Sequence, residues 1–439
     1  MSNFILAITI TAHVILKKVI ATFGTKSPLR IVFSKKKYYL CGNARIRVRV
    51  HTYIMKRTVT IGFDARHAIE GDTALSSYSR YVIEAMAATC PRHGYFRLYA
   101  ESLSSNADYQ ALALRHNVET MLPDGRLWRK MAWLWRLYAI GRDLERGDVE
   151  LYHSLDEHLP YGLGRRNIRS VVTIHSLDYL STKIFQNPVE SASRRLMTLS
   201  SLKRADRIIA LSESLKREII EAFGIDSDRI DVIYRGCDRA YSITPNAEEL
   251  AAVRERYALP ERFILTAGTQ HQRKNTAIIL DALTMAADDI HLVVASRTTA
   301  YTAVLQAHAE ELGIAHRLHI VEPATTPHRV ALYTLAEAYI QMSLYEGFAT
   351  SIVEALTTQT PVIASRGTSH EEAGGSNSIY VESNDAKGLA EAIELVASDD
   401  ELRQRMKQRG KSYVTRFRPE VAAYNILNCY RRINVDINE

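Results

Sequence analysis

The chain has 439 residues, 46% of them hydrophobic and 24% charged, and this composition excludes disordered, collagen-like and low-complexity proteins. Such a length is too great for one ordinary domain and suits two. Four cysteines are too few for a disulfide scaffold, and no two have the spacing of a metal knuckle. They are Cys41, Cys90, Cys237 and Cys429. This pattern favours a cytosolic protein with reduced thiols.

The net charge of +7 resembles that of a nucleic-acid-binding protein, but the distribution of the charges argues against that function. Residues 1–54 contain ten Lys and Arg residues and no Asp or Glu. The rest of the chain keeps 46 basic residues against 49 acidic ones and is mildly acidic. We therefore expect the main body not to bind nucleic acid.

The basic N-terminal extension, 1–54, has three interpretations. It is a translated stretch foreign to the natural protein, a basic anchor on a membrane surface, or a nucleic-acid-binding arm. Its apolar run, 4–16, has 13 residues, whereas about 20 are needed to span a bilayer. Its lysines follow this run, the reverse of a secretory signal. In all three cases the fold is expected to start at Met55.

Two series of alternating strands and helices follow, separated by a looser stretch at 237–260. The first has expected strands at 59–64, 96–100, 150–154, 170–175, 207–211 and 230–235, with helices through 78–86, over 187–204 and from Ser212 to Gly224. The second has expected strands at 262–268, 290–296, 317–321, 339–344 and 361–365, with helices from 275, over 328–338 and 351–358, and from 384 to 432. Strands alternate with helices, and several of the strands are continuous apolar runs. This pattern predicts an α/β protein with parallel sheets that helices cover on both faces. The architecture expected is two Rossmann-like domains facing a cleft.

Three turns at the carboxyl ends of strands in the second series carry candidate chemistry, because ligands of such folds bind there. In the first, 268–275, Arg273 and Lys274 precede an Asn275 that is expected to cap the next helix. Backbone donors, a helix dipole and two cations together favour a phosphate. The alternative is a solvated basic loop before a capped helix.

The second turn, 346–354, places two carboxylates eight residues apart around a glycine. Glu346 is expected at the mouth of the strand and Glu354 one turn into the helix, while Gly347 lets backbone approach a ligand. For Glu354 there is a structural alternative, since Ser351 and Glu354 have the spacing of a capping box. The third turn, 367–375, is a polar loop suited to contacts with a sugar or a base.

In this order the turns resemble the family 4 nucleotide-sugar glycosyltransferases, which have the GT-B fold. The family's Glu-x7-Glu motif corresponds to Glu346 and Glu354, its phosphate turn to 273–275, and Thr-Pro-Val-Ile-Ala-Ser to 360–365 before the Glu372 loop. In the first half the matching segments are 61–66, 152–155, 172–175, 210–214 and 232–238, and those at 152–155 and 172–175 look like the family's cleft-lining histidine strands. The resemblance spans about 58–435.

The resemblance implies retaining, metal-independent transfer of a hexose, mannose-like as the best estimate, from a GDP- or UDP-linked donor. The expected domains are an acceptor domain at 55–240, a donor domain at 241–416 and a terminal helix, 417–439, packing back on the first. Catalytic residues would be Glu346, His175 and Lys274. Donor-binding residues would be Arg273, Lys274, Thr269, Gly347, Phe348, Ala349, Thr350 and Glu354. The acceptor or phosphate loop would be Thr73, Ala74, Leu75 and Ser76.

Three departures from the family pattern bear on the acceptor and on activity. The early loop lacks its usual glycines, because it has Ala74 and Ser76. The usual His-Asp-Leu reads His175-Ser176-Leu177, and Ala349 replaces a glycine. A sugar-nucleotide-binding protein with weakened or lost transfer is therefore the second hypothesis. A dinucleotide oxidoreductase is the third, and the absence of Gly-x-Gly-x-x-Gly in 64–75 argues against it.

The expected partners are a nucleotide-sugar and a glycan or lipid-linked acceptor of surface polysaccharide synthesis, with no separate cofactor, metal or nucleic acid. A lipid-linked acceptor implies a cytoplasmic enzyme, peripheral at the inner face of the membrane.

Overall fold

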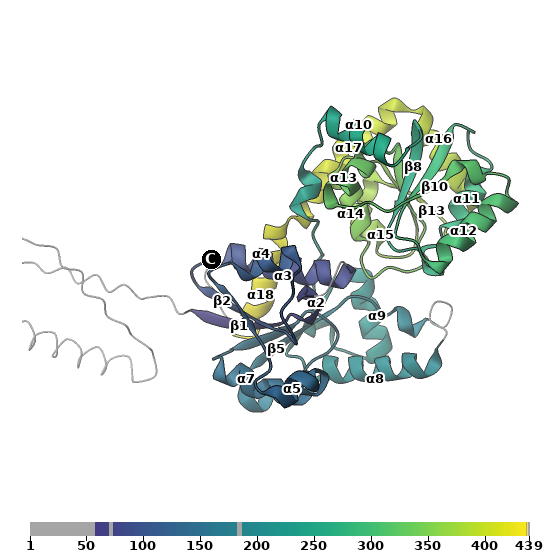
Figure 1. The fold of residues 1–439 in the computed structure, drawn as a ribbon. Helices are drawn as coiled ribbons and strands as arrows, with labels where there is room; N and C mark the ends of the chain where they lie inside the picture. The colour runs from purple at the N-terminus through teal and green to yellow at the C-terminus, as the bar shows by residue number, and fades with distance from the viewer. Residues whose placement is uncertain (1–57, 70–72, 182–186, 436, 438–439) are drawn as a thin grey trace, which may run out of the picture. The chain divides into compact units, whose positions relative to one another are not determined.

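The computed structural model describes residues 58–69, 73–181, 187–435 and 437, so the interpretations of the extension 1–54 lie outside it. The described residues form two parallel sheets with helices around them (Figure 1). The first sheet has the strand order β3-β2-β1-β4-β5-β6-β7, and the second has the order β10-β9-β8-β11-β12-β13. This arrangement confirms the expected two-sheet α/β fold.

The strands of both sheets are short and mostly buried, as continuous apolar runs require. In the first sheet they are β1 Val59–Asp64, β2 Gly94–Tyr99, β3 Val118–Met121, β4 Leu151–Ser154, β5 Arg169–Ile174, β6 Arg207–Ala210 and β7 Ile230–Val232. In the second they are β8 Arg262–Ala267, β9 Ile290–Ala295, β10 Leu318–Val321, β11 Ala338–Gln341, β12 Val362–Ser365 and β13 Ile379–Val381.

Each sheet has one point at which the strand order reverses. In the first sheet it lies between β1 and β4, where Phe63 is paired with His153. In the second it lies between β8 and β11, where Leu265 is paired with Tyr339. The loops that leave the two central strands diverge at such a point, and a crevice opens at their carboxyl ends. These two points are therefore where ligands are expected.

Helix α9, Glu213–Phe223, begins and ends where its sequence predicts. The hydroxyl of Ser212 accepts a hydrogen bond from the Leu215 amide at 3.0 Å, and Gly224 ends the helix with a φ of 65°. Leu215 and Ile219 are buried on its inner face. The helix expected through 78–86 is α3, Ala74–Thr89.

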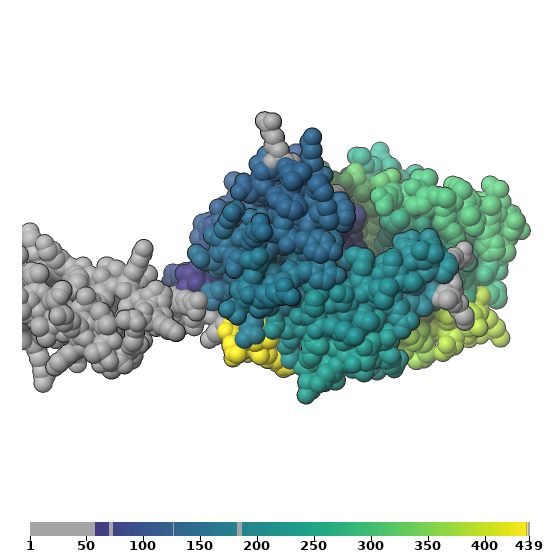
Figure 2. Space-filling view, turned by 90° about the horizontal axis from the view of Figure 1, so that it is seen from below, coloured from purple at the N-terminus to yellow at the C-terminus, as the bar shows by residue number. Residues whose placement is uncertain are grey.

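The C-terminal helix α18, Pro419–Arg431, packs on α3, as expected. The Tyr430 hydroxyl is hydrogen-bonded to Nδ1 of the buried His153 at 2.7 Å, and Arg432 forms an ion pair with Asp231 at 2.8 Å. Figures 1 and 2 show these yellow C-terminal residues against the blue and teal first half of the chain. The end of the chain thus completes the core of the first sheet.

Several elements differ from the sequence-based expectation. The strand expected at 339–344 ends at Gln341, so 342–349 forms a long loop, and the helix expected at 328–338 is α13, Thr326–Leu335. Strands β3 and β13 and helix α12, Ala300–Glu311, were not expected. The two strands have only four and three residues, too few for a periodic pattern to be recognised.

The remaining helices cover the sheets. They are α2 Arg66–Ile69, α4 Ala107–Ala113, α5 Arg126–Lys130, α6 Ala132–Leu134, α7 Ile140–Arg146, α8 Pro188–Arg204, α10 Ala247–Arg256, α11 Ala277–Leu283, α14 Thr350–Thr357, α15 His370–Gly374, α16 Ala386–Ser398 and α17 Asp400–Tyr413. Within the described ranges, no helix has both the length and the hydropathy needed to cross a membrane.

Candidate functional site

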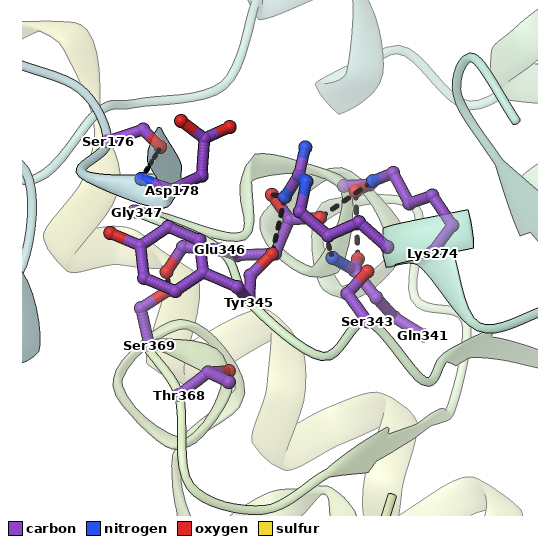
Figure 3. Close-up of polar contacts among 12 residues, drawn as sticks. Ser176, Asp178, Lys274, Gln341, Ser343, Tyr345, Glu346, Gly347, Thr368 and Ser369 are labelled. Carbon is purple, nitrogen blue, oxygen red and sulfur yellow. Dashed lines mark hydrogen bonds and ion pairs between the residues drawn. The ribbon is translucent and has the colours of Figure 1, made fainter. Parts of the chain in front are cut away.

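The loops after β8 and β11 meet at the reversal point of the second sheet and bring together residues 72 positions apart. Lys274 Nζ lies 2.8 Å from Glu346 Oε1 (Figure 3). Arg273 Nη1 lies 3.1 Å from Glu346 Oε2. The Arg273 guanidinium also donates to the Tyr345 carbonyl. Glu346, a predicted catalytic residue, is therefore in direct contact with the predicted donor-binding residues Arg273 and Lys274.

The loop after β8 is held in shape by a buried glutamine. Gly268 has a φ of 99°, which favours glycine, and its carbonyl accepts a hydrogen bond from Gln270 Nε2 at 2.8 Å. The Thr276 hydroxyl donates to Gln270 Oε1 at 2.6 Å. Arg273 and Lys274 then lie in a short 3-10 turn, Gln272–Lys274. This turn directs both cations toward the loop after β11.

The prediction that Asn275 caps the next helix is wrong. Asn275 adopts a left-handed φ of 54° at the end of the 3-10 turn, and its amide donates to the Ser383 carbonyl at 2.7 Å. Helix α11 begins at Ala277 after Thr276, and neither side chain caps it. Asparagine tolerates the left-handed conformation, and Asn275 therefore fits at the end of the 3-10 turn.

The charges at this site leave a net positive balance. Burial would raise the pKa of Glu346, but Lys274 and Arg273 outweigh burial and lower it to about 2. Glu346 is therefore ionised at neutral pH, and two cations share its single negative charge. The side chains of Arg273, Lys274 and Glu346 are only 19%, 15% and 12% exposed. A partly buried excess of positive charge is suited to an anionic ligand.

A polar network supports Glu346, and it joins Gln341, which the sequence reasoning missed, to Ser369 and His370 of the third turn. Gln341, the last residue of β11, places its Nε2 3.4 Å from Glu346 Oε1, and its Oε1 accepts from the Ser351 hydroxyl at 2.9 Å. The Ser369 hydroxyl donates to the Glu346 carbonyl at 3.0 Å. His370 lies beneath, and burial lowers its pKa to about 4. The sequence feature that could have pointed to this network is a polar residue, Gln341, at the end of an otherwise apolar strand.

Gly347 lies directly against the end of β5. A Cβ atom on Gly347 would lie 1.7 Å from the His175 carbonyl oxygen, so only glycine fits there. The Ser212 hydroxyl donates to the Gly347 carbonyl at 2.7 Å. The structure therefore places Gly347 beside His175, although the sequence assigned them to different domains.

One of the two ring nitrogens of His175 is hydrogen-bonded within the chain. Its Nε2 donates to the Leu155 carbonyl at 2.8 Å, and its ring packs edge-on against Tyr78 at 4.5 Å. Burial lowers its pKa to about 4, so the ring is neutral at pH 7. His153, which also resembled a cleft-lining residue, is instead fully buried, and both of its ring nitrogens are hydrogen-bonded.

The other predicted donor-site residues fall into two groups. Phe348 packs against Tyr234 and Phe417 at ring distances of 5.5 and 5.6 Å, so its side chain belongs to a core aromatic cluster. Ala349 is buried at the start of α14, and Thr350 is the first residue of that helix. The Thr350 amide donates to the Phe348 carbonyl at 3.0 Å. Thr269 is exposed beside the phosphate turn.

Glu354 does not form the capping box that was its structural alternative. Helix α14 begins after Ala349 without a side-chain cap, because the Ser351 hydroxyl is bonded to Gln341. Glu354 instead accepts a hydrogen bond from the Tyr333 hydroxyl at 3.1 Å. Burial raises its pKa despite the opposing effects of Arg235 and Arg329. A role in ribose binding stays a prediction.

The expected acceptor loop, Thr73 to Ser76, is the start of helix α3. The Thr73 hydroxyl oxygen accepts from the Ser76 amide at 3.1 Å, and Ser76 is buried. Arg235 donates to the Ala74 carbonyl at 3.0 Å, and Leu75 lies in the first turn. Without glycines this segment forms a capped helix, and its role toward an acceptor stays a prediction.

Two further residues connect the loops of the second sheet to the first half: Tyr345, which was not singled out, and Glu372, which lies in the loop that carried part of the family resemblance. The Tyr345 hydroxyl accepts from the Leu177 amide at 2.9 Å and donates to Glu218 at 2.7 Å. The Glu372 carboxylate accepts from the amides of Glu213 and Ser214, at 2.6 and 2.8 Å, at the start of α9. Within the described ranges, no group of three or more His, Cys, Asp or Glu residues could hold a metal ion.

Two family models match the chain in the order of its two sheets. Residues 79–241 match "Glycosyltransferase Family 4", and residues 252–413 match "Glycosyl transferases group 1". Among curated relatives, O-antigen chain mannosyltransferase B of Escherichia coli is 25% identical over 311 residues, 69% of this chain and 77% of the relative. A D-inositol 3-phosphate glycosyltransferase of Corynebacterium urealyticum is 26% identical over 61% of this chain and 66% of its own. The serotype-specific mannosyltransferase WbdA of Escherichia coli matches at 24% identity over 54% of this chain but only 30% of its own length.

Solved structures share the fold at lower sequence identity. HepE of Anabaena, in complex with UDP and glucose, superposes with a TM-score of 0.67 at 17% identity, over 85% of this chain and all of its own. WaaG, a glycosyltransferase of lipopolysaccharide biosynthesis, has a TM-score of 0.62 at 14% identity, over 83% of this chain and 98% of its own. The two matched regions, the two-sheet fold and the curated relatives together show that the chain belongs to the group 1 glycosyltransferases of the family 4 type, which have the GT-B fold.

Proposed function

We propose that this glycosyltransferase moves a hexose, mannose as first choice, from a nucleotide diphosphate sugar to a glycan or lipid-linked acceptor. The transfer retains the anomeric configuration and needs no divalent metal. The observation that carries the proposal is the placement of Arg273 and Lys274 on the single carboxylate of Glu346, at the reversal point of the second sheet.

The diphosphate of the donor is the ligand that this charge balance fits. Lys274 has three ammonium hydrogens and Arg273 has five guanidinium donors, so hydrogen bonds to Glu346 leave others for phosphate oxygens. Helix α14 begins beside Glu346 and adds the positive end of its dipole. As the glycosidic bond breaks, negative charge grows on the leaving diphosphate, and these groups stabilise it. They supply the charge that a metal ion brings in other enzymes.

The remaining residues have supporting roles in this proposal. Glu346 fixes the two cations and, being ionised, stabilises positive charge that develops on the donor sugar. His175 offers Nδ1 to the sugar or acceptor, and Glu354 accepts the ribose hydroxyls. Thr269 and the amides of 347–349 complete the donor site. Retention rests on the family resemblance alone.

The identity of the donor is supported only by the names of similar proteins. Four of the curated relatives are mannosyltransferases of Escherichia coli, and the solved HepE complex contains UDP. A GDP- or UDP-linked hexose is therefore the donor proposed. Relatives named for O-antigen synthesis favour surface polysaccharide assembly, with a lipid-linked acceptor at the cytoplasmic face of the membrane.

The experiment is a hydrolysis and transfer assay with GDP-mannose, UDP-glucose and UDP-galactose, each with and without excess EDTA. We expect turnover of one donor, unchanged by EDTA, and an α-linked product by NMR. Abolition by EDTA with rescue by Mg²⁺ would overturn the metal-independent mechanism. Binding of a donor without any turnover would favour the alternative, a sugar-nucleotide-binding protein that has lost activity.

A further inference from the structure

A cavity of about 380 Å³ lies where the two segments that connect the halves of the chain meet. One segment, 237–244, leads from β7 to α10, and the other, 414–419, leads from α17 to α18. The end of α14 forms a further wall, through Val353 and 357–359. We call this space the linker cavity. Its volume is at the lower end of the range for small-molecule sites, about 300–1,000 Å³, and suits a ligand smaller than a nucleotide-sugar.

The charge around the linker cavity is strongly positive. No Asp or Glu is among the described residues that line it, but four basic residues are: Arg239, Lys407, Lys411 and Arg418. Arg239 forms an ion pair with Glu420, which is not a lining residue. Lys407 and Lys411 share one face of α17 and form no ion pair with any described carboxylate. Like charges at this helical spacing repel each other, so an anion between them would be favoured.

Hydroxyl groups form much of the remaining wall. Three of them, on Thr334, Thr357 and Thr415, donate to carbonyl groups of their own helices at 2.8, 2.6 and 2.9 Å. A hydroxyl has one hydrogen and two acceptor lone pairs, so each of these oxygens can still accept a hydrogen bond. The wall therefore fits a ligand that has hydroxyl groups of its own. Six Ser and Thr residues line the cavity: Ser242, Thr244, Thr334, Thr357, Thr358 and Thr415.

The composition of this wall indicates the chemical class of the ligand. A phosphate monoester carries about −1.5 to −2 charges at pH 7, which matches two unpaired lysines better than a single carboxylate does. The hydroxyls match a polyol, and the buried side chains of Val353 and Phe417 match its short carbon skeleton. A hexose monophosphate combines these three features within the size of the cavity.

Buried aromatic side chains connect the linker cavity to Glu354. Tyr241, which lines the cavity, packs against Tyr333 with ring centres 5.9 Å apart. The Tyr333 hydroxyl donates to the Glu354 carboxylate at 3.1 Å. Glu354 also follows Val353 directly on α14, and Val353 is itself a lining residue. A ligand in the cavity would therefore act on the position of Glu354 through direct packing.

We infer that the linker cavity binds a hexose monophosphate as an effector, separate from the nucleotide-sugar. Lys407 and Lys411 bind its phosphate, and the Ser and Thr hydroxyls bind those of the sugar. Because Tyr241 and Tyr333 connect the cavity to Glu354, the bound effector changes the affinity for nucleotide. This coupling rests on the proposed donor function of Glu354, whereas binding in the cavity does not.

The first test measures binding of glucose 6-phosphate, inorganic phosphate and methyl α-D-glucopyranoside to the full chain by isothermal titration. We expect glucose 6-phosphate to bind at least about tenfold more tightly than either other probe, since it alone has both groups. The double variant Lys407→Ala/Lys411→Ala should weaken its binding at least about tenfold. Arg405→Ala/Arg409→Ala is the matched control, because it removes the same charge at the same spacing from α17, outside the cavity.

A further variant separates the linker cavity from the donor site. Lys274→Ala should bind glucose 6-phosphate as the wild type does, because Lys274 does not line the cavity. No glucose 6-phosphate binding by the wild type, equally tight binding of inorganic phosphate, or wild-type affinity in Lys407→Ala/Lys411→Ala would overturn the inference. Loss of binding in Lys274→Ala would place the ligand in the donor site and would overturn it as well. Alanine favours helix, so unchanged melting temperatures are expected and show that the variants are folded.

The second test measures the coupling to the donor site. UDP and GDP are titrated with and without saturating glucose 6-phosphate, and we expect the affinity of one nucleotide to change at least about fivefold in the wild type. The affinity should not change in Lys407→Ala/Lys411→Ala. A nucleotide affinity that is the same with and without glucose 6-phosphate would overturn the effector role. If neither nucleotide binds but glucose 6-phosphate binding depends on the two lysines, the cavity site stands and the proposed donor function fails.

Discussion

Glu346 is the residue on which the donor site depends, because it neutralises one of two cations that would otherwise repel each other. Lys274 and Arg273 are 2.8 and 3.1 Å from its carboxylate oxygens, and all three side chains are largely buried. Removing the charge of Glu346 would leave two buried cations without a counter-charge, so its effect is structural as well as chemical.

The first prediction concerns the pH dependence that Glu346 contributes to stability. Its pKa is about 2 when folded and near 4.5 when unfolded, so the stabilisation is complete above pH 4.5 and is lost as the pH falls through 2. This shift corresponds to about 3 kcal/mol. Glu346→Gln cannot titrate. We therefore expect the stability advantage of the wild type over Glu346→Gln, measured by urea unfolding, to shrink between pH 5 and pH 3. An advantage that is constant over this range would contradict the ion pairs.

The second prediction concerns Glu354, whose capping alternative the structure removes. If Glu354 accepts the ribose hydroxyls, Glu354→Ala loses charge-assisted hydrogen bonds worth about 1.5–3 kcal/mol and weakens nucleotide binding by about one to two orders of magnitude. Isothermal titration measures this directly. Glu311→Ala, at an exposed helical position, is the control and should bind as the wild type does. Unchanged nucleotide affinity in Glu354→Ala would show that the residue only supports Tyr333.

At the scale of elements, the loop 342–349 matters most, because it carries Glu346 and lies against the end of β5. Gly347 makes this approach possible, since any Cβ would collide with the His175 carbonyl oxygen. The hydrogen bonds of Ser212 to Gly347 and of Tyr345 to Leu177 fix the same contact. The donor residues and His175 are thus positioned by a backbone contact.

We expect Gly347→Ala to separate the loop from β5 and to lower kcat/KM for transfer by at least about 100-fold, because small displacements at a reaction centre have effects of that size. Its melting temperature should change little, since each sheet has its own buried strands. Gly164→Ala is the matched control, as a Cβ there meets nothing within 4 Å, and it should leave activity unchanged. Wild-type activity in Gly347→Ala would show that transfer does not need the close contact between loop 342–349 and the end of β5.

The elements also show what the sequence could and could not predict. Ser212, the amphipathic run and Gly224 predicted α9 correctly because all three signals are local. Asn275 has the same local appearance, but its amide bonds to Ser383, more than 100 residues away, and this contact overrode the cap. Asp64, Asp156 and Arg136 form a buried cluster that was not predicted, because only the order of strands in the sheet brings its three segments together.

At the scale of the whole molecule, the two sheets are organised alike, with a polar site at the reversal point of each. In one, two cations share a single carboxylate, and in the other two arginines face two carboxylates. The terminal helix α18 returns to α3, so the chain passes twice between the two halves. The first described strand begins at Val59.

A chain that begins at Met55 should therefore unfold at the same temperature as the full chain and bind nucleotide equally well. The reason is the abrupt change in charge after residue 54 and the complete strand β1 that follows. Differential scanning calorimetry and nucleotide titration of both chains provide the measurement. A lower melting temperature, or weaker nucleotide binding, would show that residues 1–54 are integral to the protein.

The measurement that tests the account most directly is the affinity of wild-type protein and Lys274→Ala for UDP, GDP and their sugar derivatives. The account predicts that one nucleotide diphosphate series stabilises the wild type, by about 2.7 kcal/mol at 100 times its Kd. It predicts that Lys274→Ala weakens this binding and lowers kcat by about 10²–10³, because leaving-group charge is greatest in the transition state. Lys387→Ala, at an exposed lysine, should match the wild type. If no nucleotide diphosphate binds the wild type, or if Lys274→Ala binds and turns over its donor normally, the assignment of this site is contradicted.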